Sequence, residues 1–252
     1  DVRKAEQDLS DEGHTYETTM KRLALDGSIT DRVDFQIERE LKDNDPWRDV
    51  FVNVRISNAL EVRVGKFKMP FGYERLTSVA DLDFAYRTQL SDIIAPGRDI
   101  GVQVAGSLFR RVMSYQVGGF RHDGDNARLR EEVFLLPGEP AQSPDRSFVA
   151  RASFEPLRHA SGPREVRRLF LGVAFTQSEV RDGLDSLRGQ SLFGQEFAER
   201  MYVRGHRRRI GTEIVWLPGP FGVKSEYARS NEQREGQGLA DEDLSDFVTA
   251  AW

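Results

Sequence analysis

Apolar and polar residues alternate along most of this chain, which is the pattern of β-strands that have one apolar and one polar face. Residues 33–38 read VDFQIE, so three apolar and three polar side chains point to opposite sides of one predicted strand. The same alternation recurs at residues 22–26, 52–56, 62–64, 100–105, 113–118, 148–154, 169–176, 210–216 and 221–227, and a last strand begins near Phe247. We predict roughly eleven strands and no long helix. The segments 79–90 and 185–199 are candidates only for short helical turns.

The connections between these predicted strands fall into two classes. Short turns are expected at 27–31, 57–61, 106–111 and 218–220, with a somewhat longer one at 156–165. Long polar loops are expected at 42–49, 69–98, 121–146, 177–207 and 231–246. Short turns at one end and long loops at the other are the organisation of an outer-membrane β-barrel. A soluble β-sandwich also alternates apolar and polar residues, but it has no reason to sort its loops by length.

The composition does not separate these two architectures. The chain has 252 residues, of which 38% are hydrophobic and 31% charged, and no apolar run approaches the ~20 residues of a membrane helix. A barrel uses only every second strand residue against lipid, so its composition resembles that of a soluble protein. The polar face would be the exterior of a sandwich or the lumen of a barrel. The polarity of the strand faces alone is therefore compatible with both a sandwich and a barrel.

Several other classes of function are disfavoured. The absence of cysteine excludes disulfide scaffolds, zinc-thiolate sites and cysteine nucleophiles. The net charge of −5 argues against a nucleic-acid binder, and the four histidines lack metal-ligand spacing. No nucleophile elbow, phosphate loop or zinc-protease motif occurs, so we expect no enzyme, no cofactor and no metal. The segment 122–126 has weak similarity to a calcium loop. The run 207–209 is expected to be solvated or to contact lipopolysaccharide phosphates.

Four motifs together suggest a family. They are GKFKMPFG at 65–72, LTS at 76–78, APGRDIGVQVAG at 95–106 and WLPGPFGVKSEY at 216–227. The chain resembles, over nearly its whole length, the phosphate-selective porin family (porin O and P) of the outer membrane of Gram-negative bacteria. The resemblance implies a homotrimeric, 16-stranded porin whose third long loop folds into the lumen. We therefore expect residues 1–252 to be one all-β domain, an antiparallel up-and-down transmembrane β-barrel. With about eleven strands it would be incomplete, as an internal fragment.

The loop 69–98 is the expected constriction, and the bases in and beside it are the expected anion path. The candidates are these five bases and two residues with hydroxyl groups: Lys66, Lys68, Arg75, Thr77, Ser78, Arg87 and Arg98. The polar strand faces supply candidate lumen-wall bases, which are Arg22, Arg55, Arg63, Arg151 and Lys224. Arginine offers a fixed fork of donors that suits phosphate or carboxylate. For Arg98, where the loop rejoins the wall, we favour a contact that anchors the loop to a wall carboxylate over contact with a passing anion.

The same loop also carries acids. Glu74, Asp81 and Asp83 are expected to pair with wall arginines such as Arg55, Arg63 and Arg151; left unpaired, they would favour cations. Leu76, Val79, Leu82 and Phe84 are expected to pack against the wall or one another. The expected function is passive conduction of small hydrophilic solutes, chiefly anions such as phosphate, in contact with outer-membrane lipid and lipopolysaccharide. The alternative is a non-channel barrel or a soluble sandwich that acts as a binding or structural protein.

Overall fold

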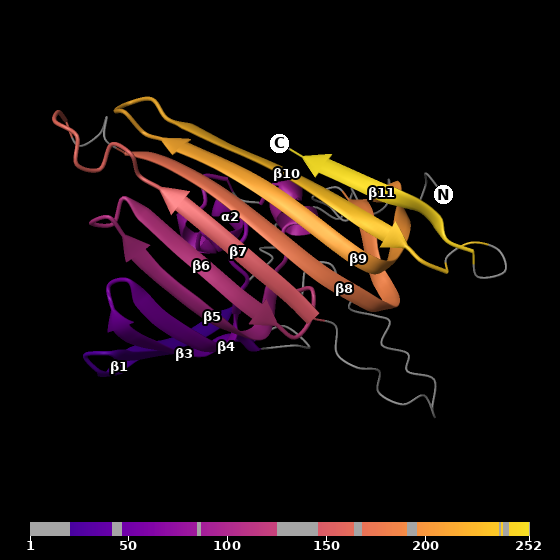
Figure 1. The fold of residues 1–252 in the computed structure, drawn as a ribbon, viewed down its shortest axis with the longest axis horizontal. Coiled ribbons are helices and arrows are strands. Elements are labelled where there is room, and N and C mark those ends of the chain that lie inside the picture. The colour runs from indigo at the N-terminus through magenta and orange to yellow at the C-terminus, as the bar shows by residue number, and fades with distance from the viewer. Residues whose placement is uncertain are drawn as a thin grey trace, which may run out of the picture.

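One antiparallel sheet accounts for all the strands in the described part of the chain. The computed structural model describes residues 21–41, 47–84, 87–124, 146–163, 168–190, 196–236, 238 and 242–251. The strands are β1 (Arg22–Thr30), β2 (Val33–Glu40), β3 (Trp47–Ser57), β4 (Leu60–Lys68), β5 (Arg98–Leu108), β6 (Met113–Phe120), β7 (Arg146–Phe154), β8 (Leu169–Gln190), β9 (Glu196–Trp216), β10 (Val223–Arg234) and β11 (Leu244–Ala251). They pair in sequence order into an 11-stranded sheet, which curves as a barrel wall does (Figure 1).

This arrangement confirms the predicted all-β, up-and-down architecture. Each described strand hydrogen-bonds to its neighbours in the sequence, and β1 and β11 each pair with one strand only. The described strands do not form a second layer, so the sandwich alternative is excluded. No helix in the described residues is long and apolar enough to cross a membrane.

The two faces of the sheet are inverted relative to those of a soluble protein. On β9, Ile210 is 47% exposed, whereas Arg209 beside it is 1% exposed. On β5, Val102 is half-exposed and Gln103 is buried. A sheet in water would bury the apolar side chains instead. The exposed apolar face is therefore suited to lipid, and the buried polar face is the interior of the curve.

The apolar strand residues, which a barrel turns towards lipid, share this exposed face. Leu23, Ile37, Val102 and Ile214 are exposed, and Val33, Phe35 and Leu171 are partly exposed. Among the aromatic residues near strand ends, Trp216 and Phe221 are also exposed. Phe120 instead points inward, where its ring meets that of Phe67 at a centroid distance of 5.3 Å.

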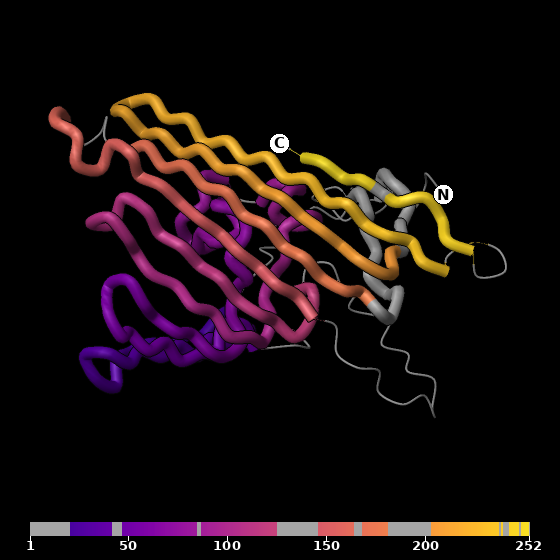
Figure 2. Tube along the Cα trace, viewed as in Figure 1, coloured from indigo at the N-terminus to yellow at the C-terminus, as the bar shows by residue number. Residues whose placement is uncertain are grey.

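The long connection between β4 and β5 lies inside the curve. We call residues 69–97 the inner loop. It contains three short helical elements: α2 (Tyr73–Leu76), the 3₁₀ turn η1 (Val79–Asp81) and the single π-turn η2 (Leu90–Ile94). Figure 1 shows α2 behind the middle strands, and Figure 2 shows the same segment in purple crossing behind β7–β9. The contacts of η2 with β8, β10 and β11 place it on their inner face.

The prediction of a long loop at 177–207 was wrong. β8 continues to Gln190 and β9 begins at Glu196, so the two strands form one long hairpin and the helical turn expected at 185–199 does not occur in the described residues. The loops expected at 42–49 and 231–246 are also shorter, because β3 begins at Trp47, β10 runs to Arg234 and β11 begins at Leu244. Most of the expected loop 121–146 lies outside the described residues.

The exposure of Ile210 gives a test of the outward face. In the full-length protein folded into phospholipid vesicles, Ile210→Lys should lower the free energy of unfolding by about 2–4 kcal/mol, because it puts a charge on the lipid side. The measurement is a urea titration. The control is Arg208→Lys, on the same face of the same strand at a position that already carries a charge, where little change is expected. Equal stability of both variants would show that this face does not contact lipid.

Candidate functional site

Two parts of the inner loop, one near its start and one near its end, rest on a row of small residues across four strands. Ala174 on β8 pairs with Gly211 on β9, which pairs with Ala228 on β10, which pairs with Ala251 on β11. The loop side chains that pack on this row are Phe71, Leu90, Ile94 and Ala95, and all of these are buried. A Cβ atom at Gly211 would lie 2.9 Å from Cζ of Phe71, so only glycine leaves room for the ring. Small inward residues therefore let the loop lie directly on the wall.

The start of the inner loop is held by a second apolar cluster. Phe67, Met69, Phe120 and Val149 are buried together, with the ring of Phe51 beside them. The guanidinium of Arg63 covers this cluster from within the barrel curve, at 4.4 Å from the centroid of Phe51 and 5.6 Å from that of Phe67. Arg63, a predicted lumen-wall base, thus contacts aromatic rings.

The end of the inner loop is held by ion pairs. Nε and Nη2 of Arg98 both donate to Oδ2 of Asp49 on β3, at 3.0 and 2.7 Å, and both residues are buried. The next residue, Asp99, accepts a hydrogen bond from the backbone N–H of His122, whose Nδ1 lies 3.1 Å from Oδ1. Arg98 therefore meets a wall carboxylate where the loop rejoins the sheet.

Two further bases support the backbone of the loop itself. Lys68 Nζ donates to the carbonyl oxygens of Leu76 and Thr77, at 3.2 and 3.0 Å. Arg87 donates to the same Thr77 oxygen at 2.8 Å and also to the carbonyl oxygen of Glu74. The expected hydroxyl groups are used locally. The Thr77 side chain donates to Tyr73 O, and Ser78 Oγ accepts from the N–H of Ala80.

These contacts gather four bases in one place. Lys68 lies close enough to Arg98, Arg87 and Arg75 to interact with their charges. Arg87 interacts in the same way with Arg98 and with Arg22 of β1. Burial lowers the pKa of the Arg87 guanidinium from its ordinary value, against the opposing effect of Glu74 and Asp92. Arg75 lies 3.6 Å from Asp92. We call Lys68, Arg75, Arg87 and Arg98 the basic cluster.

Lys66 does not belong to this cluster. The register pairs it with Val50 and Ile100, whose strands carry their apolar residues outward, and it shares a strand face with the exposed Val64. The adjacent Phe67 points inward and is buried. The expectation that Lys66 borders the anion path is therefore not supported by the register.

The partners expected for the loop acids were wrong. Asp83 pairs with Lys224 of β10 at 2.5 Å, while Glu74 accepts hydrogen bonds from Thr88 and Ser91 within the loop. The N–H of Glu74 donates to Oε1 of Glu226 at 2.5 Å, which ties the loop to β10. Asp81 is exposed. Phe84, which we expected to pack, is also exposed, at 77%.

The remaining wall bases find carboxylates on neighbouring strands. Arg22 pairs with Glu40 at 2.8 Å and Arg55 with Asp34 at 3.0 Å. Arg151 on β7 pairs with Glu213 on β9 at 2.7 Å, reaching across β8. A Cβ at Gly172 of β8 would lie 2.7 Å from Oε2 of Glu213, so this glycine makes room for the pair.

A fully buried carboxylate holds the segment after β6. Asp123 accepts two hydrogen bonds from Arg209, at 2.6 and 2.7 Å, and others from Arg207 and Ser178. Burial alone would raise the pKa of the Asp123 carboxyl, but the charges of Arg209 and Arg207 hold its pKa below the ordinary value. Arg207 also lies 3.4 Å from Glu232 of β10. These contacts link β6, β8, β9 and β10.

This network corrects two expectations. Arg207 and Arg209 are buried strand residues, while only Arg208 between them is exposed, so the run is not a solvated outer loop. Asp123 serves as an arginine partner, which argues against the calcium loop; Asp125 and Asn126 lie outside the described residues. The described part of the chain contains no group of three or more potential metal ligands.

The carboxylates that hold the bases were not predicted as a set. Asp49, Asp99, Asp123 and Glu213 each stand alone in the sequence, among many other acids. Only the inward position of Glu213 could be read from the sequence, because this residue alternates with the outward-facing Thr212 and Ile214. The partners of Asp49, Asp123 and Glu213 were not deducible, because these pairs join residues 49 to 86 positions apart.

Loss of the Asp123 carboxylate should destabilise the barrel wall. Asp123→Asn leaves Arg207 and Arg209 without their shared negative charge, and breaking a buried pair in this way costs about 3–5 kcal/mol. The free energy of unfolding in vesicles measures this effect. Asp26→Asn on the exposed part of β1 is the matched control and should change stability by less than about 0.5 kcal/mol. Similar losses in both variants would contradict the role of Asp123.

Added volume at Gly211 should displace the inner loop. Gly211→Val drives methyl groups into the Phe71 ring, and overpacking of this kind costs about 1–3 kcal/mol. We expect faster proteolysis within residues 69–97 and a changed single-channel conductance. Gly119→Val is the control, because an added Cβ there meets no atom within 4 Å. A loop that stays protected in Gly211→Val would show that Phe71 does not anchor it.

Comparison with known proteins assigns this chain to a family. The family described as phosphate-selective porin O and P matches residues 1–251 of the chain. A search of curated proteins gave no match. The match extends over nearly the whole sequence and agrees with the sheet, its inverted faces and the inward loop. The chain belongs to the phosphate-selective porin O and P family, whose members are outer-membrane porins and channels, not enzymes.

Proposed function

We propose that this porin conducts small anions, phosphate among them, past the basic cluster of its inner loop. The observation that carries the proposal is the gathering of Lys68, Arg75, Arg87 and Arg98 inside the barrel curve. These side chains come from β4, from the loop and from the start of β5. The fold of the loop brings them together from positions up to 30 residues apart.

The balance of charge near the cluster favours anions. Three acids influence its bases, which are Asp49, Asp92 and Glu74. Among the described residues, these four bases against three acids leave an excess of positive charge. Arg22, which also acts on Arg87, is itself paired with Glu40. Low-dielectric walls focus such a field along a narrow path, and rings of lysine and arginine are the physical basis of anion selectivity in pores.

The members of the cluster differ in the role that we assign to them. Arg98 is buried against Asp49 and acts chiefly as the anchor of the loop. Arg87 lies in the loop itself, is partly exposed, and is the base that we assign to solute contact. Arg75 is buried behind the half-exposed Asp92, and we assign it a contribution to the field and no direct contact. Thr77 and Ser78 shape the loop backbone and are not assigned a role in solute contact.

Homotrimeric assembly, which the family resemblance implies, is part of the same proposal. The broad apolar outer face supplies surface for both lipid and neighbouring subunits. Migration of the full-length protein on denaturing gels, before and after heating, measures the oligomer.

The selectivity should depend on the loop arginines. In planar bilayers under a KCl gradient, Arg75→Gln with Arg87→Gln should shift the reversal potential towards cations. Removing one charge about 10 Å from a water-filled path changes the relative permeability about twofold, so the pair should give roughly fourfold. Repeating the measurement in a phosphate gradient tests the preferred solute.

Two controls separate charge from folding. Arg75→Lys with Arg87→Lys keeps both charges and should keep the anion preference, even where the hydrogen bonds to Thr77 change. Arg208→Gln removes an exposed outer-face charge and should leave the reversal potential unchanged. The proposal fails if the glutamine pair has no effect, or if Arg208→Gln shifts the potential as much.

A further inference from the structure

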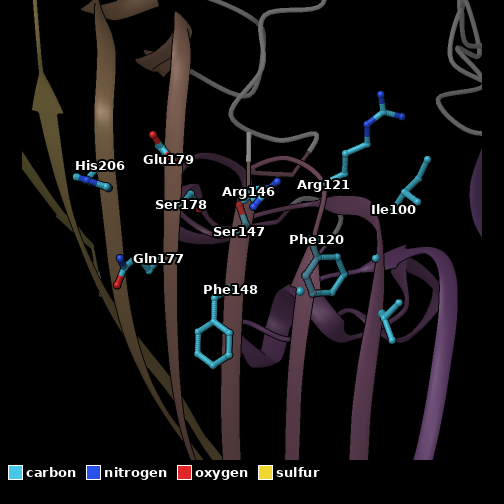
Figure 3. A pocket seen from close by; sticks show the side chains of 13 residues that line it. Ile100, Phe120, Arg121, Arg146, Ser147, Phe148, Gln177, Ser178, Glu179 and His206 are labelled. Atoms are coloured by element: carbon cyan, nitrogen blue, oxygen red, sulfur yellow. The ribbon is translucent and has the colours of Figure 1, made fainter. Parts of the chain in front are cut away.

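A groove on the outer face of the sheet is not explained by conduction. It has a volume of about 610 Å³ and lies over β5–β9 near the long-loop end (Figure 3). Its volume falls within the roughly 300–1,000 Å³ of typical ligand pockets. It opens towards the outside of the barrel curve, away from the inner loop and the basic cluster. A solute inside the barrel curve would not reach this groove.

A glycine creates the depression. Gly119 on β6 pairs with Val102 on one side and Phe148 on the other, and an added Cβ at Gly119 would meet no atom within 4 Å. Val102 and Phe148 are each 48% exposed, and Ile100 is 50% exposed. Two apolar walls thus stand on either side of a strip of bare backbone. The lower part of the groove is therefore a mainly apolar slot, with Gln177 beside Phe148.

The side chains that line the groove become charged one row further towards the long loops. The next outward residues are Arg121 and Arg146, which follow directly from the Phe120–Ser147 pair, and then Glu179 and His206 in the adjacent strands. All four line the groove, and Figure 3 shows Arg121 and Arg146 along its upper rim. Within the described residues, neither guanidinium forms an ion pair with a carboxylate. Among the described groove residues, two guanidinium groups and one carboxylate line this rim.

The order of the apolar and charged rows indicates where the groove lies in the membrane. Below the groove, Val104, Val117, Phe175 and Ile210 form an apolar row across the same strands. Above it, the row is charged. The groove therefore spans the boundary between hydrocarbon and headgroups, and long loops lie on the extracellular side of such barrels. The boundary is that of the outer leaflet.

We propose that this groove binds lipid A, the phosphorylated glycolipid of the outer leaflet, with an acyl chain over Gly119 and a phosphate group on Arg121 and Arg146. Guanidinium groups bind phosphate through paired hydrogen bonds, and a base at a membrane surface attracts an anionic headgroup. Phe148 and Val102 would contact the acyl chain. This site rests on the outer-membrane location of the protein and not on the selectivity of its channel.

The test uses the full-length protein purified in detergent. Purified lipid A is titrated against it, with native mass spectrometry as the readout, beside phosphatidylglycerol and phosphatidylcholine as other lipids. Arg121→Gln with Arg146→Gln should weaken lipid A binding roughly 10- to 30-fold. Gly119→Leu fills the slot without a backbone clash and should also weaken binding while both arginines remain.

The controls make the outcome decisive. Arg208→Gln removes a nearby outer-face arginine outside the groove, and Val173→Leu adds volume elsewhere on the outer face; both should bind lipid A as the unaltered protein does. Heat-modifiable migration and single-channel conductance should be unchanged in all variants, which separates this site from the proposed function. Unchanged lipid A binding in the arginine pair and in Gly119→Leu would overturn the proposal. Equal binding of phosphatidylglycerol and lipid A would also overturn it, because the groove would then recognise only the negative charge of a lipid headgroup.

Discussion

Several charged side chains that point into the curve of this sheet form ion pairs there, and the rest of the described structure depends on that pairing. Strand alternation sends every second residue inward, away from lipid. A buried charge without a partner is strongly unfavourable, so inward bases need inward acids. Arg209 meets Asp123 and Arg151 meets Glu213, in each case across strands. The pairs therefore connect strands that are not neighbours, in addition to the backbone hydrogen bonds.

The inner loop uses the same chemistry together with close packing. Arg98 and Asp49 fix its return to the wall, while Phe71 near its start packs on the small residues of β8–β11. The second contact is possible because Gly211 has no side chain to occupy the position of the ring. Glycine is otherwise unfavourable in a strand, so its presence here reflects the close approach of another segment. The loop is thus held near both of its ends, by close packing and by an ion pair.

The sequence predicted the strands and their faces better than the partners within the site. The alternation at 33–38 and 210–216 identified both the elements and the outward residues, because lipid contact imposes a strict period of two. It did not identify the long β8–β9 hairpin, since residues 181–190 are rich in Arg, Asp and Gly and lack apolar alternation. Ion-pair partners depend on register across strands, which a local pattern does not contain. For this reason Asp83 was assigned to an arginine, whereas its partner is Lys224.

The pairing of inward charges also limits what the pore can do to a passing solute. A base that is fully neutralised by a buried acid contributes little field to the lumen, so Arg209 and Arg151 serve the wall. The bases that we propose act on the solute are those near open space. Arg87 is partly exposed, with Arg98 and Arg22 as basic neighbours and Glu74 and Asp92 as acidic ones. Because Arg87 also donates to the backbone at Thr77, its position is fixed relative to the path. A fixed charge needs little reorganisation when an anion arrives, and the same contacts that hold the loop therefore maintain the field that we propose selects the solute.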